Sequence, residues 1–203
     1  SWKGAKGKKI RNLASLKTGQ LLNSLKSDDR FVRDQARRVL IDQADKTSKA
    51  LNGWIGKQKT EAARLQGLWL SQALNKHNEK LLNELLAAKE PKIRAAAVRV
   101  LSDWADPRTD LKRGIMANQA LTKFEKLVAD SHPRVRLEAV RGVAKIGNTK
   151  AAEIALKALD KEMDRFLDYG LWLAMNELAG PFMSALQAGK FNGSDKQLEF
   201  ALA

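Results

Sequence analysis

The chain of 203 residues carries 37 Lys and Arg against 23 Asp and Glu, a formal net charge of +14, and 44% of its residues are hydrophobic. It contains no cysteine, which excludes disulfides, thiol catalysis, thiolate metal sites and covalent haem attachment. No apolar run approaches the roughly 18 residues that a membrane span needs, so we expect no transmembrane segment.

The positive charge is concentrated at the N-terminal end. Residues 1–60 hold 15 Lys and Arg against 5 Asp and Glu. Residues 1–12 are rich in Lys and Gly and lack an apolar period, which predicts a basic linker or tail. A basic end attracts nucleic acid, anionic lipid or an acidic protein, although it also serves simply to keep a protein soluble.

One pattern then occurs five times, anchored on Arg33, Arg64, Arg94, Arg136 and Leu167. The residue before each anchor is apolar, and the residue three positions after it is Ala or Gly. The anchors lie 31, 30, 42 and 31 residues apart. Self-similarity at such spacings predicts stacked structural units, each of which cannot bury its apolar face alone.

The predicted repeat region covers residues 13–188. Val and Ile occur in it at helical spacing rather than in alternation, so no strand is expected. The predicted fold is therefore all-α, a right-handed α-solenoid of about five antiparallel helix pairs. The second helices of these pairs are expected near residues 31–43, 59–74, 92–104, 134–146 and 162–178.

The longest spacing contains an insertion, which predicts a loop at residues 105–117. Insertions in solenoids gather on one face, often the binding face, although a tolerated surface loop explains this one as well. Residues 189–203 are expected to form a loop and the start of a further helix. Because the chain opens abruptly at Ser1 and ends within an apparent helix, we expect it to be a segment of a larger protein.

Two of the repeats carry a recognisable motif. Residues 132–141 read HPRVRLEAVR, and residues 91–101 read PKIRAAAVRVL. Both resemble the HEAT repeat, a relative of the armadillo repeat, and the resemblance extends over most of residues 18–178. It implies a stack of helix pairs that acts as a protein-binding scaffold.

A narrower resemblance concerns the HEAT region of large exported proteins of planctomycete and related bacteria. In those proteins a β-propeller similar to sugar dehydrogenases precedes the HEAT region, and a cytochrome-c-type haem domain follows it. The resemblance implies a spacer between redox domains, with the neighbouring domains as partners and a periplasmic or cell-surface location. No Cys-x-x-Cys-His occurs in this sequence, so no cofactor is expected in it. The strings that carry the resemblance are ARRVLIDQAD (36–45), RLQGLWLSQALN (64–75), HPRVRLEAVR (132–141) and FLDYGLWLAMNELAGPFMSALQAGKF (166–191).

Two rows of arginines are the candidate binding residues. Guanidinium groups that recur at one height of successive repeats bind phosphates or carboxylates. Alternatively, they bond acidic side chains or carbonyl groups of the adjacent repeat. The candidates are the anchors Arg33, Arg64, Arg94 and Arg136 and a second row of Arg38, Arg99 and Arg141.

The remaining candidates are aromatic and titratable side chains. Trp69, Trp104 and Trp172 fall on second helices and are predicted to lie in the core between repeats. Asp103 and Trp104 form a candidate base-handling pair, because HEAT-like alkylpurine DNA glycosylases use Asp, Trp and Arg to hold a damaged base. The two histidines do not recur with carboxylates at ligand spacing, so no metal site is expected.

Two functions follow from these observations. The first is a non-catalytic scaffold with a protein partner or neighbouring domain and no catalytic residue. The alternative is a basic nucleic-acid-binding protein, including an alkylpurine-type DNA glycosylase, which would act in the cytoplasm. A third hypothesis places residues 3–17 on an anionic polysaccharide or membrane. The oligomeric state and the identity of the partner do not follow from the sequence.

Overall fold

The computed structural model describes residues 13–108 and 117–203. Over these residues the chain forms twelve α-helices, two short 3-10 helices and no strand, which confirms the all-α prediction. The predicted tail at residues 1–12 and most of the predicted loop at 105–117 lie outside the described residues. The helices gather into two compact units, Ser1–Lys76 and His77–Ala203, where the sequence analysis had treated residues 13–188 as one body.

The described part of the first unit contains two helix pairs. Asp29 begins the second helix of the first pair, because its carboxylate accepts the Phe31 N–H, a donor without a partner inside the helix. The Trp54 indole donates to the Asn23 side chain at 3.0 Å and joins the two pairs. The elements are η1 Leu13–Ser15, α1 Thr18–Ser24, α2 Arg30–Asp42, α3 Ala44–Gly56 and α4 Glu61–Ala73.

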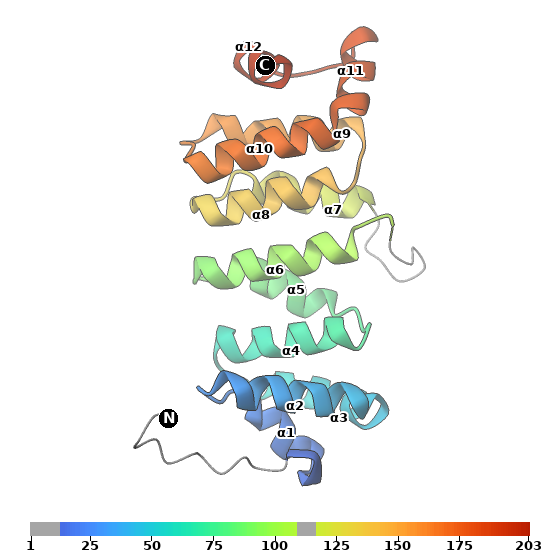
Figure 1. Cartoon of the computed structure of the whole chain (residues 1–203), viewed down its shortest axis with the longest axis vertical. Helices are drawn as coiled ribbons and strands as arrows, with labels where there is room; N and C mark the ends of the chain where they lie inside the picture. Colours follow the sequence, from blue (N-terminus) through green and yellow to red (C-terminus); the bar gives the residue numbers. More distant parts are fainter. Residues whose placement is uncertain (1–12, 109–116) are drawn as a thin grey trace, which may run out of the picture. The chain divides into compact units, whose positions relative to one another are not determined.

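The second unit repeats the same arrangement (Figure 1). The second helices α6, α8 and α10 lie side by side, and α5, α7 and α9 pack against them from one side. Two further helices follow. The elements are α5 Glu79–Leu86, α6 Pro91–Trp104, α7 Ala117–Leu127, α8 Pro133–Ala144, α9 Thr149–Leu156, η2 Lys157–Asp160, α10 Arg165–Glu177, α11 Ala179–Gln187 and α12 Asp195–Leu202.

The helix starts follow from local chemistry. Pro91 and Pro133 are the first residues of α6 and α8, where a missing N–H costs no hydrogen bond. The α10 helix begins three residues later than the predicted start at residue 162. The cause is Asp164, whose carboxylate accepts the N–H groups of Phe166 and Leu167 at 2.9 and 2.8 Å.

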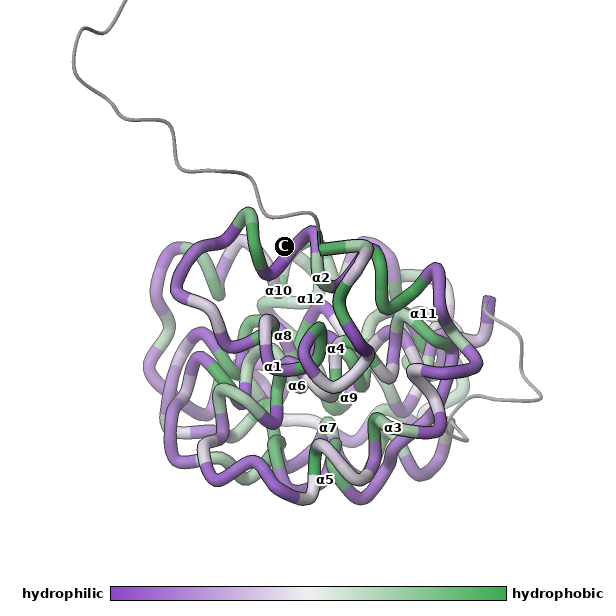
Figure 2. Tube along the Cα trace, turned by 90° about the horizontal axis from the view of Figure 1, so that it is seen from below, coloured by the Kyte–Doolittle hydropathy of each residue, from purple (hydrophilic) through white to green (hydrophobic). Residues whose placement is uncertain are grey.

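Each helix of the stack is amphipathic, and hydrophobic and hydrophilic stretches alternate along the helical trace (Figure 2). In α8 the residues Val135, Ala139, Val140 and Val143 are fully buried at helical spacing. Packing is close at Gly142, where an added Cβ would lie 2.6 Å from the Phe124 ring of α7. The absence of a side chain at Gly142 therefore lets α8 pack closely against α7.

The predicted burial of the tryptophans holds for one of the three. Trp104 is buried and its ring stacks on that of His77, with centroids 4.7 Å apart. Trp69 is half-buried beneath the Arg37 guanidinium. The prediction is wrong for Trp172, which is 48% exposed, because α10 turns Leu171 into the core and the next residue points about 100° away from it.

Candidate functional site

Three anchor arginines make the same contacts in their own repeats. In each case the guanidinium donates to the two carbonyl groups six and five residues earlier in the chain, in the turn before its helix. Arg33 reaches the carbonyls of Ser27 and Asp28 at 2.6 and 2.9 Å. Arg94 bonds Ala88 and Lys89 at 2.8 and 3.1 Å, and Arg136 bonds Asp130 and Ser131 at 3.0 and 3.3 Å.

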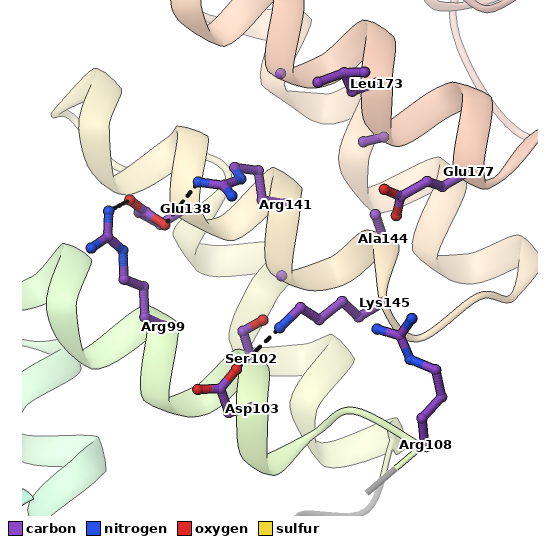
Figure 3. A pocket seen from close by; sticks show the side chains of 13 residues that line it. Arg99, Ser102, Asp103, Arg108, Glu138, Arg141, Ala144, Lys145, Leu173 and Glu177 are labelled. Atoms are coloured by element: carbon purple, nitrogen blue, oxygen red, sulfur yellow. Dashed lines mark hydrogen bonds and ion pairs between the residues drawn. The ribbon is translucent and has the colours of Figure 1, made fainter. Parts of the chain in front are cut away.

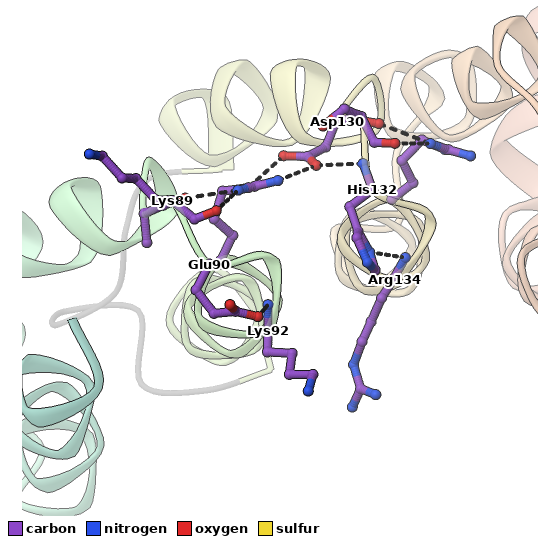
Figure 4. A network of polar contacts seen from close by, with 10 residues as sticks. Lys89, Glu90, Lys92, Asp130, His132 and Arg134 are labelled. Atoms are coloured by element: carbon purple, nitrogen blue, oxygen red, sulfur yellow. Dashed lines mark hydrogen bonds and ion pairs between the residues drawn. The ribbon is translucent and has the colours of Figure 1, made fainter.

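Two of these arginines also reach the next repeat of the second unit (Figure 4). Arg94 donates from Nε and Nη2 to the two carboxylate oxygens of Asp130, at 2.9 and 2.8 Å. Arg136, which is 4% exposed, donates to the Glu162 carbonyl. The arginines thus link three successive turns, and the groups that they use for this are not available to an external anion.

Asp130 is the centre of this network. Burial opposes ionisation of its carboxyl group, but the hydrogen bonds from Arg94 and from the His132 N–H lower its pKa below the ordinary value of 3.8. The carboxylate is therefore held ionised, as a bidentate acceptor for Arg94. The sequence analysis did not predict this pair, because Arg94 and Asp130 lie 36 positions apart in the chain.

The second row of arginines has a different environment, because in the second unit it borders a groove. The groove has a volume of about 890 Å³ and lies over the exposed side of α6, α8 and α10. Its lining residues are Arg99, Ser102, Asp103, Arg108, Glu138, Arg141, Gly142, Ala144, Lys145, Gly170, Leu173, Ala174 and Glu177.

Arg99 of α6 and Arg141 of α8 share the carboxylate of Glu138 (Figure 3). Arg99 donates a hydrogen bond to it, and the nearest N–O distance from Arg141 is 3.8 Å. The Glu138 side chain is 6% exposed, whereas those of Arg99 and Arg141 are 56% and 63% exposed. The hydrogen bond that Arg99 donates to the Glu138 carboxylate raises the pKa of the Arg99 guanidinium. The groove therefore presents two oriented guanidinium groups above a buried carboxylate.

At Arg108, another residue of the groove lining, an exposed guanidinium is again held by a largely buried carboxylate. The Arg108 guanidinium is 73% exposed and is held at 2.8 Å by Asp106, whose side chain is 10% exposed. The hydrogen bond from Arg108 lowers the pKa of Asp106 to about 2. Lys145 of α8 contacts Asp103 of α6 at 3.1 Å.

The proposed base-handling pair is not assembled in one place. The Asp103 carboxylate lies at the groove beside Lys145, as Figure 3 shows. Trp104, the next residue along α6, is buried against His77 and is not among the groove residues. One side chain therefore faces the groove and the other the interior, because consecutive residues of a helix point about 100° apart.

The other candidate arginines lie in the first unit or outside the groove. Arg38 is exposed on α2, and Arg64 is half-buried on α4. Arg33 holds its own turn, as described above. The structure thus brings Arg99 and Arg141 together around Glu138, and it joins Arg94 to Arg136 through Asp130. Binding of an anion or partner by any of these residues stays a prediction.

A further surface feature lies on α10 and was not predicted. Phe166, Tyr169, Trp172 and Leu173 are 61%, 60%, 48% and 41% exposed. The rings of Tyr169 and Trp172 stack with centroids 6.0 Å apart, and Leu173 also lines the groove. We call these four residues the α10 stripe. Its spacing of three, three and one is visible in the sequence, but the sequence analysis considers only Trp172 and predicts that this residue lies in the core.

Two further classes of site do not occur in the described part of the chain. Residues 13–108 and 117–203 contain no group of three or more His, Asp or Glu side chains that would hold a metal ion. None of the helices in the same ranges has the length and apolarity to cross a membrane.

The fold is the helical-repeat fold of the HEAT and armadillo type. Residues 78–170, all in the second unit, match the family profile of HEAT repeats. The chain is also similar to an engineered protein solved by the Northeast Structural Genomics Consortium, with a TM-score of 0.51 and 16% identity, over 91% of this chain and 93% of that one.

A second solved structure shares the fold. It is a designed armadillo repeat protein in complex with the peptide (KR)4, with a TM-score of 0.50 and 17% identity, over 92% of this chain and 97% of that one. A comparison with curated proteins found no match. At these identities the similarity establishes the fold and leaves the function to be argued from the site.

Proposed function

We propose that this chain is a non-catalytic scaffold that binds an extended segment of a protein partner in the groove of its second unit. The main observation behind this proposal is the groove itself, which is lined by side chains of the three successive second helices α6, α8 and α10. Neighbouring helices pack about 10 Å apart, and an extended chain rises about 3.3 Å per residue, so each repeat would contact roughly three residues of such a segment.

Two points support a binding rather than a catalytic role. The carboxylates of Glu138 and Asp103 are engaged in ion pairs with Arg99, Arg141 and Lys145, whereas hydrolytic chemistry needs a carboxyl group poised to exchange a proton. In addition, the designed armadillo repeat protein of similar fold was solved with a peptide. A peptide is thus one class of ligand that a protein of this fold can bind.

The experiment is a selection of random peptides displayed on phage against the whole chain, followed by NMR. Selected peptides should shift the amide signals of Gly142 and Gly170, which line the groove, and leave Gly53 of α3 unchanged. Failure to select any peptide, or shifts confined to residues outside the groove, would contradict the proposal.

Within this proposal, the partner is a neighbouring domain of an exported redox protein. The support is the narrower sequence resemblance described above. The sequence of the parent gene tests it, because a propeller before this segment and a Cys-x-x-Cys-His after it are both expected. A parent that lacks both would leave the scaffold proposal standing and remove the exported redox context, including the location outside the cytoplasm.

A further inference from the structure

The α10 stripe and the paired arginines occupy equivalent positions of neighbouring repeats. The anchors Arg136 and Leu167 are 31 residues apart, and the same offset relates Glu138 to Tyr169 and Arg141 to Trp172. At these two positions α8 carries an ion pair between a carboxylate and a guanidinium, whereas α10 carries two stacked aromatic rings. The exposed side of the second unit therefore changes from charged to aromatic within a single repeat.

The charged part of this surface, around Arg99 and Arg141, suits a carboxylate ligand. Glu138 lies beneath Arg99 and Arg141 and orients both guanidinium groups, whose side chains remain more than half exposed. A guanidinium has five N–H donors, and a single carboxylate below it uses only some of them. Both arginines line the groove, and their remaining donors can serve a planar acceptor with two oxygens.

The α10 stripe offers an apolar contact surface beside the charged part around Arg99 and Arg141. Tyr169, Trp172 and Leu173 are exposed together, and Leu173 belongs to both the stripe and the groove. A contiguous exposed patch of this kind marks an interaction site, and Tyr and Trp are the side chains that carry the most energy in such sites. Most of the net charge of +14 lies in residues 1–60, so the local charge at the groove decides the occupant. The exposed guanidinium groups of Arg99, Arg108 and Arg141 favour an acidic segment over a second copy of this basic chain.

We propose that the groove takes an acidic segment of a partner protein, with an aromatic or large aliphatic residue about three positions from an acidic residue. The carboxylate binds Arg99 and Arg141, and the apolar side chain rests on Tyr169, Trp172 and Leu173 of the α10 stripe. This inference rests on the proposed function, because it names the chemistry of the segment that the scaffold would hold.

The first test is a fluorescence-anisotropy titration of the whole chain with labelled peptides of about ten residues. The probe carries two acidic residues, with phenylalanine three positions after the second. We expect it to bind at least about tenfold more tightly than a peptide with lysine in place of the acids, or one with serine in place of phenylalanine. Equal binding of all three peptides would overturn the inference.

Matched variants then locate the contacts. Arg141→Ala and Trp172→Ala change exposed side chains, so both variants should keep the helical circular dichroism of the parent. Each should weaken binding of the acidic probe by about tenfold, whereas Phe31→Ala, which removes an equally exposed ring from α2, should leave it unchanged. Unaltered affinity in both groove variants would overturn the inference.

The outcomes also separate this inference from the proposed function. If phage selection yields peptides that bind the groove glycines but lack an acidic and an aromatic residue, the scaffold proposal stands and the inference fails. A single-stranded oligothymidine that displaces the acidic probe and loses affinity in the same two variants would overturn it in favour of nucleic acid, whose bases stack on exposed rings. Absence of any peptide binding would contradict both proposals.

Discussion

At the scale of single residues, arginine has two distinct roles in this protein. The anchors Arg33, Arg94 and Arg136 donate to carbonyl groups of the turn before their helix, and so satisfy acceptors at the ends of helices. Arg99 and Arg141 lie five residues after their anchors and face the solvent above Glu138. A shift of five residues turns a side chain by about 140° around the helix, which separates the structural arginines from the exposed ones.

Asp130→Asn tests the structural role of the arginine network. The substitution removes the ionised bidentate acceptor of Arg94, which is 14% exposed, and we expect a loss of about 2 kcal/mol in the free energy of unfolding near neutral pH. Asp106→Asn is the matched control, because it affects a pair whose arginine is mostly exposed, and it should cost less than about 1 kcal/mol. Urea denaturation followed by circular dichroism measures both.

The same variant carries a pH dependence. Folding lowers the pKa of Asp130 below 3.8, so the ionised Asp130 carboxylate stabilises the folded state. This stabilisation is fully present above pH 3.8 and is lost as the pH falls through the lower pKa of the folded state. The stability difference between the parent and Asp130→Asn should therefore shrink at acidic pH. A difference that stays constant from neutral to strongly acidic pH would contradict this assignment.

A pair of tryptophan substitutions tests the observed burial. Trp104→Ala removes a buried ring that stacks on His77, and we expect it to destabilise the protein by about 3 kcal/mol. Trp172→Ala removes a ring that is 48% exposed and should change stability by no more than about 0.5 kcal/mol. Equal destabilisation by the two substitutions, measured by thermal unfolding, would show that Trp172 is buried in solution.

At the scale of elements, the separation between second helices depends on small residues. Gly142 of α8 faces the fully buried Phe124 of α7, and Ser102 of α6 also lies close to it. The Ala or Gly three residues after each anchor is likewise buried in all five repeats, namely at Ala36, Gly67, Ala97, Ala139 and Gly170. The repeat pattern therefore includes both the apolar core residues and the positions where helices approach most closely.

Gly142→Ala should be destabilising although alanine favours helices. The added Cβ would lie 2.6 Å from the Phe124 ring, which is enclosed and cannot withdraw, so we expect a cost of about 1–3 kcal/mol. Gly53→Ala in α3 is the matched control, because no atom lies within 4 Å of the new Cβ, and it should stabilise by about 0.5–1 kcal/mol. Opposite signs in chemical denaturation are the expected result, and stabilisation by both would contradict the packing at Gly142.

At the scale of the whole molecule, the net charge of +14 bears on the nucleic-acid alternative. Positive charge alone produces binding to DNA that depends strongly on salt, since each neutralised phosphate releases counterions. Asp103 and Trp104, the pair on which a glycosylase role rested, point to different surroundings. The charge is therefore the main remaining argument for this alternative.

We expect duplex DNA to bind only at low salt. Titration of labelled duplex with the whole chain, followed by fluorescence anisotropy, should give a dissociation constant weaker than about 100 μM at roughly 0.15 M salt, the weak limit of non-specific binding. Asp103→Asn should not alter this affinity. Tight binding that survives physiological salt would favour the nucleic-acid function over the scaffold, and a glycosylase assay on the same variant would follow.

The sequence by itself determined the fold class and the positions of the helices. The repeat pattern placed all five second helices within three residues of their observed starts, because apolar residues at helical spacing and first-turn residues such as Pro91 and Pro133 act locally. The same pattern identified Arg99 and Arg141 as candidates. Local information was sufficient for each of these predictions.

Only the tertiary structure decided what each side chain faces. It divided the helices into two units, paired Arg94 with Asp130 across 36 residues, and placed Glu138 beneath two arginines. It also exposed Trp172, which the repeat pattern had assigned to the core. These contacts join residues far apart in the chain, and they depend on how one repeat packs on the next, which a pattern within each repeat does not specify.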